Sequence, residues 1–300
     1  MTINSSSVPA EIPEIEFSRP INYYFGRFNV IGIYEDKRDF LACGFNTAET
    51  ISKNNHTWGF FEVDFLQNEV GEFISGFLVK YNPEGAGEEV ANPVTRQLGE
   101  AIFLNSVAAK SRFFLHIKSG LVAYYLKPGI NQLQFQEFFK DIFQKGHGEF
   151  FVNADIQNIE ERQNFFERIE KLQKILRVST RLHPSNPSNH DRWKKTDERL
   201  KSLGASSYSE TYEAKSNSQG LDIKRDEDFC SKAHMAQDGY GKTKVKGMLD
   251  DEVINVSTGE EPITALAPSE GEGTRILTEI LPTFKSIFSR TPNKNDENKT

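Results

Sequence analysis

The sequence predicts an α+β protein with largely antiparallel sheets, and three observations lead to that class. Segments rich in aromatic and β-branched residues come in runs, which is typical of strands that pair through turns. Amphipathic stretches with helical spacing are interspersed among these runs, without a regular alternation of strand and helix. Phenylalanine occurs 24 times in 300 residues, so most of the chain is expected to fold.

The predicted strands are segments enriched in aromatic and β-branched residues that end at turn signals. In chain order they cover residues 21–36, 57–67, 72–82, 111–117, 121–126, 149–156, 175–183, 206–214, 220–224 and 240–248. The fourth and fifth flank a Lys-Ser-Gly turn at 118–120 and are therefore expected to form a hairpin.

Helices are predicted where apolar residues recur at helical spacing. They cover residues 92–110, 131–146, 158–174, 189–203 and 226–236. The clearest is 131–146, which has phenylalanines on one side and Gly146 at its end. The helix over 189–203 is expected to be capped by Ser188 or Asn189 and to stop at Gly204.

Composition divides the chain into four expected parts. They are a flexible arm over 1–17, a β-rich N-terminal domain over 18–147, a basic α+β domain over 148–258, and a final part over 259–300. In this final part a linker-like stretch (258–274) precedes an amphipathic segment, and residues 291–300 form a tail expected to be disordered.

The amphipathic segment over 274–289 leaves two interpretations open. Behind a tether, its apolar face would dock on a protein partner, a membrane subunit or a second copy of the chain, giving a homo-oligomer. Alternatively, it is a terminal helix that folds back on the core of its own domain.

We expect a cytoplasmic protein without a bound cofactor. The first sixteen residues lack the basic start and apolar core of a signal peptide, and no apolar run reaches the length of a membrane span. The two cysteines, Cys43 and Cys230, match no metal-ligand spacing and are expected to be buried thiols.

Charge is distributed unevenly along the chain. The net charge is −7, yet residues 171–247 hold 16 Lys and Arg against 10 Asp and Glu, a balance of +6. A basic middle between acidic flanks indicates an anionic partner, with an ordinary solvated surface as the alternative.

The lysines within residues 236–246 indicate a strand rather than a phosphate-binding loop. "AQDGYGKT" fits a loosened phosphate-loop pattern, but no apolar strand precedes it and no helix is predicted after it. Lys242, Lys244 and Lys246 recur with period two and would form a ladder about 13 Å long on one strand face. Such a ladder would follow a phosphate backbone, or it would protect an edge strand from aggregation.

The stretch "RLHPSNPSNHDRWKK" over 181–195 has the composition of an anion site. Amides at a helix start, with Asn186, Ser188 and Asn189, would hold phosphate oxygens, unless the stretch is only a rigid proline turn. Trp193 would either stack on a base or lie in the core. The residues predicted to bind nucleic acid are Arg177, Arg181, Asn186, Asn189, Arg192, Trp193, Lys194, Lys195, Lys242, Lys244 and Lys246.

A magnesium-dependent nuclease is the enzymatic alternative. Such a site needs carboxylates near a lysine, and two acid-x-Lys tripeptides supply them: Glu213 with Lys215, and Asp222 with Lys224. Magnesium is required only under this alternative.

Four blocks of the sequence resemble an uncharacterised bacterial family known as a domain of unknown function. They are "SRPINYYFGRFNVIGIY", "SRFFLHIKSGLVAYY", "RLHPSNPSNHDRWKK" and "DGYGKTKVKG", and the resemblance covers roughly residues 15–260. More remotely, the layout is similar to phage-exclusion proteins such as Rex protein A and the soluble Kiwa subunit. That similarity implies a DNA-binding protein of phage defence or a mobile element that works with a membrane partner.

The leading expectation is therefore a non-enzymatic protein that binds nucleic acid through residues 177–246. Binding to the backbone would be salt-sensitive and weakly sequence-specific, and DNA is the expected target. The alternatives are the magnesium nuclease and a pure interaction protein that assembles through residues 274–289.

Overall fold

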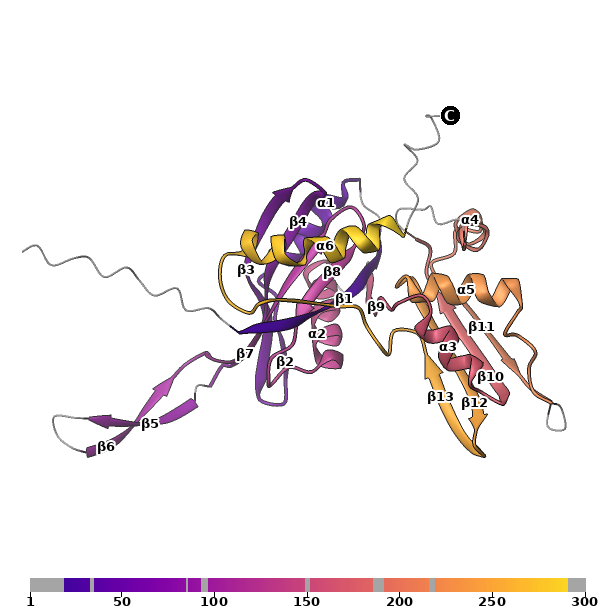
Figure 1. Ribbon diagram of the computed structural model, residues 1–300. Helices are drawn as coiled ribbons and strands as arrows, with labels where there is room; N and C mark the ends of the chain where they lie inside the picture. Colours follow the sequence, from indigo (N-terminus) through magenta and orange to yellow (C-terminus); the bar gives the residue numbers. More distant parts are fainter. Residues whose placement is uncertain are drawn as a thin grey trace, which may run out of the picture.

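The computed structural model describes residues 19–32, 35–84, 86–92, 97–148, 152–185, 192–215 and 219–290. Within these residues the chain forms two lobes that lie side by side, each built on an antiparallel sheet with helices (Figure 1). The α+β class with largely antiparallel sheets is therefore confirmed.

The first lobe is built on an eight-stranded antiparallel sheet. Seven strands run in the order β14-β1-β8-β7-β4-β3-β2, and β9 shares with β14 the outer edge of β1. Their bounds are Pro20–Ile31 (β1), Ile51–Lys53 (β2), His56–Asn68 (β3), Gly71–Asn82 (β4), Ser106–His116 (β7), Leu121–Tyr125 (β8), Asn153–Asn158 (β9) and Thr264–Pro268 (β14).

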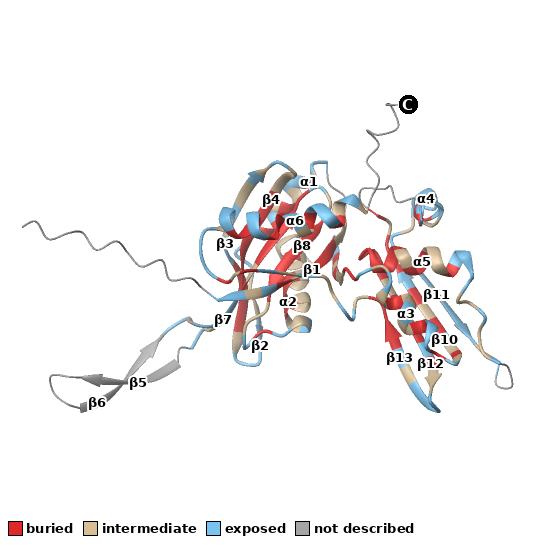
Figure 2. Ribbon diagram, viewed as in Figure 1, coloured by how far each residue is buried: buried red, intermediate tan, exposed pale blue. Residues whose placement is uncertain are grey.

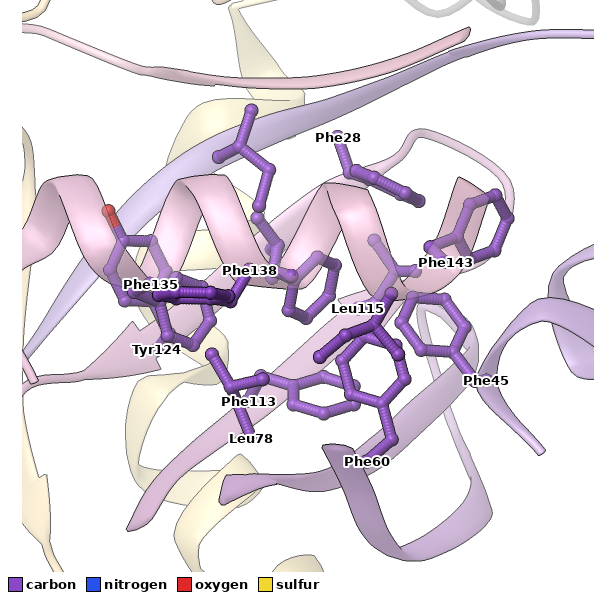
Figure 3. Packing of buried hydrophobic residues seen from close by; sticks show 14 of the residues in the cluster. Phe28, Phe45, Phe60, Leu78, Phe113, Leu115, Tyr124, Phe135, Phe138 and Phe143 are labelled. Atoms are coloured by element: carbon purple, nitrogen blue, oxygen red, sulfur yellow. The ribbon is translucent and has the colours of Figure 1, made fainter. Parts of the chain in front are cut away.

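Two helices, α1 (Lys37–Phe45) and α2 (Gln132–Gly146), cover one face of this sheet. The helix α2 starts with a capping box, in which the side chains of Asn131 and Gln134 each accept the backbone N–H of the other residue. Its phenylalanines pack against aromatic side chains of the sheet (Figure 3). The fully buried Phe139 has ring contacts with Phe28, Phe45, Phe60, Phe113 and Phe135.

The amphipathic segment near the end of the chain is the helix α6 (Gly273–Ser289), which lies across the other face of the same sheet (Figure 1). The ring of Phe284 lies 5.1 Å from that of Phe25 and 5.0 Å from that of Phe73. Of the two interpretations that the sequence left open, the structure shows the helix folded back on the chain's own core. Its buried residues, drawn red in Figure 2, are Ile276, Leu277, Ile280, Leu281, Phe284 and Ile287.

The second lobe has a four-stranded antiparallel sheet in the order β11-β10-β12-β13. The helices α3 and α5 cover one face, where Phe165 and Phe229 join Val178 and Val245 in a common core. The helix α4 packs in turn against α5. The bounds are Asn164–Glu170 (α3), Lys174–Leu182 (β10), Lys194–Ser202 (α4), Tyr208–Glu213 (β11), Glu227–Gln237 (α5), Gly241–Leu249 (β12) and Glu252–Ser257 (β13).

The second lobe is inserted between β9 and β14 of the first sheet, and the two connecting segments run together. The amide of Ile263 donates to the carbonyl of Ile159 at 2.8 Å, and both residues bond to the backbone of Phe25. Beside them the Glu160 side chain is fully buried, and it accepts hydrogen bonds from the Gly259 amide and from Arg168. Burial raises the pKa of Glu160 above its ordinary value.

Several elements differ from those that the sequence predicts. Residues 92–110 are not a helix: β6 (Gln97–Phe103) pairs with β5 (Ala86–Asn92), and β7 then pairs with β4. Pairing along these strands overrides the helical propensity of an Ala-, Gln- and Glu-containing segment.

Two further corrections concern segments in the second half of the chain. The linker-like stretch contains β14, which pairs with β1. Residues 220–224 form no strand, although the amide of Leu221 donates to the carbonyl of Ile175 in β10. In the first half of the chain the helix α1 was not predicted, although Asp36 caps it in the usual way. The expectation of two buried thiols is wrong, because Cys43 on α1 is exposed and Cys230 on α5 is half-buried. The flexible arm over 1–17 and the tail over 291–300 lie outside the described residues.

No helix in the part of the chain that the structure describes is long and apolar enough to cross a membrane.

Candidate nucleic-acid interface

The lysines at 242, 244 and 246 lie on β12, as the period-two pattern predicts. Thr243 and Val245 point the other way and are fully buried beneath the helices of the second lobe. Lys244 and Lys246 are exposed and Lys242 is half-buried. The three lysines therefore project from the sheet face that points away from α3 and α5, which we call the open face.

Two predicted arginines join these lysines through the register of β10 with β12. Arg181 lies opposite Lys242, and Arg177 lies opposite Lys246. Opposed residues on antiparallel strands have Cβ atoms about 5 Å apart, so the cations form two adjoining rows. The structure thus brings together five residues that the sequence predicted as a binding surface.

The open face is strongly cationic. Its side chains on the four strands are Lys174, Arg177, Ser179, Arg181, Ser209, Thr211, Glu213, Lys242, Lys244, Lys246, Met248, Val253 and Asn255. Among them Glu213 is the one carboxylate, and it lies 3.3 Å from Arg177 in an exposed ion pair that contributes little stability. In the described residues, Arg181 and the three lysines form no ion pair.

Lys174 belongs to the open face but was missed by the sequence analysis. It lies opposite Met248, and a bulge between Ile175 and Arg177 shifts the register before the arginines begin. Alternation counted backwards from Arg177 gives Ile175 as an outward residue, whereas Ile175 is buried. The signal was thus present in the sequence but was obscured by one extra residue.

The position of β12 in the sheet decides between two explanations of its lysines. β12 pairs with β10 on one side and with β13 on the other, so it is an internal strand. Lysines that discourage aggregation are needed on edge strands, where unpaired backbone groups are presented. Protection of an edge therefore does not explain this row of lysines.

Arg192, Lys194 and Lys195 lie on a different surface. All three are exposed, but they belong to the start of α4, which packs on α5 through Leu200 and therefore lies on the helix-covered side of the sheet. Figure 1 shows α4 beyond α5, at one end of the second lobe. The predicted single basic interface is thus divided between the open face and this helix.

Trp193 is a core residue. It is 2% exposed, and its indole N–H donates to the Asp238 carboxylate at 2.9 Å, so its ring has no free face for a base. It also occupies the N-cap position of α4, so the helix begins later than the predicted caps at 188 and 189. Asn186, Ser188 and Asn189 lie outside the described residues.

A buried polar cluster, which the sequence did not predict, ties the chain at Ser185 to α4. The carboxylate of Asp197, 1% exposed, accepts hydrogen bonds from the backbone N–H and the hydroxyl of Ser185, at 2.7 and 2.6 Å. Lys201, one turn further along the helix, donates to the same carboxylate at 2.7 Å. These contacts are those of a structural anchor, because they tie the chain at Ser185 to two residues of α4.

The residues of the nuclease alternative are placed for structural contacts. Lys224 donates to the carbonyls of Glu170 and Leu172 at 2.9 and 2.8 Å, and so ties down the end of α3. Glu213 pairs with Arg177, and Asp222 stands on a loop rather than on a strand face. Within the described residues, no three His, Cys, Asp or Glu side chains gather closely enough to hold a metal ion.

Comparison with known proteins gives a family but no described function. Among curated proteins, none matches the chain. Residues 45–281 match the family described as a domain of unknown function, DUF4747. The matched range includes the second lobe, most of α6 and every strand of the first sheet except β1, which lies before it. The chain therefore belongs to the DUF4747 family.

Proposed function

We propose that this protein binds nucleic acid through the open face of its second lobe. The observation that carries the proposal is the internal strand β12, on which three lysines stand beside two arginines of β10. Among the described residues, four of these five cations have no carboxylate partner. Like charges held side by side at the surface are unfavourable unless a polyanion neutralises them. A phosphate backbone is a polyanion long enough to contact a row about 13 Å in length.

The side chains of the open face favour contact with the backbone over recognition of bases. The described residues of this face include no aromatic ring: Tyr212 is opposite Val178 and so belongs to the other face of the sheet. Sequence-tolerant binding of single strands usually relies on stacked aromatic rings. Lysines, arginines and the hydroxyls of Ser179 and Thr211 bind phosphate oxygens instead, so binding is expected to be salt-dependent and weakly sequence-specific.

The test is a titration of labelled duplex DNA and single-stranded RNA at several salt concentrations, with and without magnesium. The variant with Lys242→Glu, Lys244→Glu and Lys246→Glu should bind far more weakly than the wild type. For every phosphate that the variant no longer neutralises, the slope of log affinity against log salt should become shallower by about 0.9 on duplex DNA. Circular dichroism would establish that the variant is folded.

A matched control variant changes the net charge by the same amount at another part of the surface. Lys110, Lys118 and Lys171 are exposed and lie off the open face, so their triple change to Glu should reduce affinity only slightly. A third variant carries Arg192→Glu, Lys194→Glu and Lys195→Glu. It compares the basic surface at the start of α4 directly with the open face. Equal losses in the open-face and control variants, or no binding by the wild type at about 50 mM salt, would contradict the proposal.

We extend the proposal to a role in cytoplasmic defence against phage, which is the expectation drawn above from the layout of the sequence alone. Such a role would be exercised through the same surface. Cells producing the wild-type chain would then plate phage less efficiently than cells producing the open-face triple variant. Equal plating would leave DNA binding standing and remove the defence role.

A further inference from the structure

A cleft of about 460 Å³ lies between the two lobes, at one end of the open face. One of its walls is formed by β10 and β12 of the second lobe, and the other by β9 and α2 of the first lobe. The lining side chains are Lys140, Asn153, Asp155 and Gln157 from the first lobe, and Ser179, Arg181, His183, Ser209, Lys242 and Lys244 from the second.

The wall from the second lobe is the end of the basic rows already described. Arg181 and Lys242 are opposed across β10 and β12, and Lys244 belongs both to the lysine row and to the cleft. Next to Lys242, Gly241 has a φ of +145°, and a Cβ there would collide with the carbonyl oxygen of Arg181. Only glycine fits, so the backbone is bare at this point of the cleft.

The wall from the first lobe is polar by strand alternation. Asn153, Asp155 and Gln157 line the cleft from one face of β9, while Ala154 and Ile156 are buried in the core beneath α2. The carboxylate of Asp155 accepts a hydrogen bond from the Gln157 amide. Lys140 comes from α2 and stands near the carboxylate of its neighbour Asp141, at 4.0 Å.

The net charge of the described lining is therefore positive, and the excess of cations comes from the second lobe. Lys140, Arg181, Lys242 and Lys244 face a single carboxylate in the cleft, that of Asp155. Lys140 of the first lobe and the three cations of the second lobe outnumber this carboxylate, and like charges that share one cleft repel one another unless an anion lies between them. An anion is thus the class of ligand that this cleft suits.

Contacts between the lobes fix the two walls in place. The Arg27 guanidinium, 7% exposed, donates to the carbonyl of Asp238 at 2.8 Å and lies 4.3 Å from the centre of the Tyr240 ring. Asn29 donates to the carbonyl of Gly239 at 2.7 Å. These bonds hold the turn that leads directly into Gly241 and Lys242, so the cleft is formed before a ligand enters.

We propose that this cleft binds a phosphate monoester, with Lys140 on one side of the phosphate and Arg181 and Lys242 on the other. The inference rests on the proposed function, because the lysine row would guide a nucleic-acid strand towards this end. A cleft of this volume accommodates a ligand of nucleotide size. The one aromatic ring in its described lining is the imidazole of His183, which is 6% exposed and has its Nδ1 3.3 Å from the carbonyl of Ser206, so it offers little surface for a base to stack on. The dianionic phosphate is therefore the group that it recognises.

The phosphate monoester has two sources, a strand terminus and a free nucleotide, and the experiment separates them. Fluorescence anisotropy would compare one single-stranded oligonucleotide in three forms: 5′-phosphorylated, 3′-phosphorylated and unphosphorylated. Competition with AMP forms the second arm. The wild type should bind at least one phosphorylated form about fivefold or more tightly than the unphosphorylated one, and AMP should abolish that preference.

The Lys140→Gln variant assigns the preference to the cleft, since Lys140 does not belong to the open face. It should lose the preference for a terminal phosphate and keep its affinity for the unphosphorylated oligonucleotide. Lys118→Gln, a change at an exposed lysine away from the cleft, should keep both. Thermal unfolding of both variants should match that of the wild type, which excludes a general loss of structure.

The outcomes distinguish the inference from the proposed function. Equal binding of all three oligonucleotides, or a preference that survives Lys140→Gln, would overturn the inference and leave backbone binding intact. AMP binding that requires Lys140, in a protein that binds no oligonucleotide, would support the phosphate cleft and overturn the proposed function.

Discussion

Arg181 and Lys242 lie directly opposite each other on adjoining internal strands, and within the described residues neither has a carboxylate partner. Opposed like charges on a sheet destabilise it by up to about 1 kcal/mol. The folded chain therefore keeps a repulsive pair at the place where the open face meets the cleft. A bound anion would convert this repulsion into attraction, which links the stability of the second lobe to its ligand.

Neutralising one member of this pair should stabilise the free protein. Lys242→Gln is expected to raise the free energy of unfolding by about 0.5 kcal/mol at low salt, because the repulsion with Arg181 disappears. The gain should vanish at about 0.5 M salt, where the Debye length falls to a few ångströms. Urea denaturation at the two salt concentrations measures both values, with Lys118→Gln as control. A loss of stability at low salt would mean that the pair is not repulsive.

His116 should make the fold sensitive to mild acid. The side chain is 4% exposed, its Nε2 lies 3.2 Å from the carbonyl of Val70, and its Nδ1 lies 2.8 Å from the Ser119 hydroxyl. Burial, with repulsion from Lys37, Lys118 and Arg27, lowers the pKa of His116 to about 4.

In the unfolded chain this pKa is near 6.5, so the unfolded state binds the proton more tightly. The free energy of unfolding should therefore fall as the pH drops from about 6.5 to about 4, by about 3 kcal/mol from this residue. Urea denaturation across this range would show a shallower fall in His116→Gln, after the pH-independent difference between the proteins is subtracted. Parallel curves would show that His116 does not titrate on unfolding.

The docking of α6 predicts a large loss of stability on truncation of one ring. Phe284 is fully buried between Phe25 and Phe73, so Phe284→Ala should lower the free energy of unfolding by about 3–5 kcal/mol. Phe288→Ala, at a half-buried position four residues later, should cost clearly less. If the helix instead served only to hold a partner, both variants would unfold like the wild type.

The contact of Arg27 with the second lobe should couple the unfolding of the two lobes. Arg27→Met removes bonds to the carbonyls of Asp238 and Ser119, each 2.8 Å long, at an expected cost of about 3 kcal/mol. The chain has two tryptophans, Trp58 in the first lobe and Trp193 in the second, so each reports one lobe.

With Arg27 unchanged, the single-tryptophan variants Trp58→Phe and Trp193→Phe should give coincident denaturation midpoints, after the effect of each tryptophan substitution on stability is subtracted. In the Arg27→Met background the two midpoints should separate, with the second lobe unfolding first. Coincident midpoints in that background would show that other contacts couple the lobes.

Local patterns in the sequence predicted most of the elements and one half of the proposed binding surface. Alternation in Gly241–Leu249 predicted a strand with three lysines on one face, and helical spacing predicted α2 with its phenylalanines. The approach of β10 to β12 could not be predicted in this way, since the two strands lie far apart in the sequence. It depends on which strands pair, and single-sequence periodicity carries no information about pairing partners.

The elements that the sequence mispredicted have a common physical cause. Residues 97–110 and 264–268 contain few β-branched residues, and they become strands because β4, β5 and β1 offer them partners. The cleft could not be predicted either. It arises where the first-lobe wall with Lys140 faces the second-lobe wall with Arg181. The positions of the two walls depend on Arg27 and Asn29, which hold the lobes together.

The return of α6 to the first sheet has a consequence for synthesis on the ribosome. β1, β3, β4, β7 and β8 emerge well before α6, and the whole second lobe is translated in between. Until then, no helix in the described part of the chain covers the side of the sheet that carries Tyr23, Phe25, Phe73 and Phe114. The nascent first lobe would therefore expose a wide aromatic surface for roughly ten to thirty seconds at ordinary elongation rates of about 5–20 residues per second, which would make it a natural client of ribosome-associated chaperones.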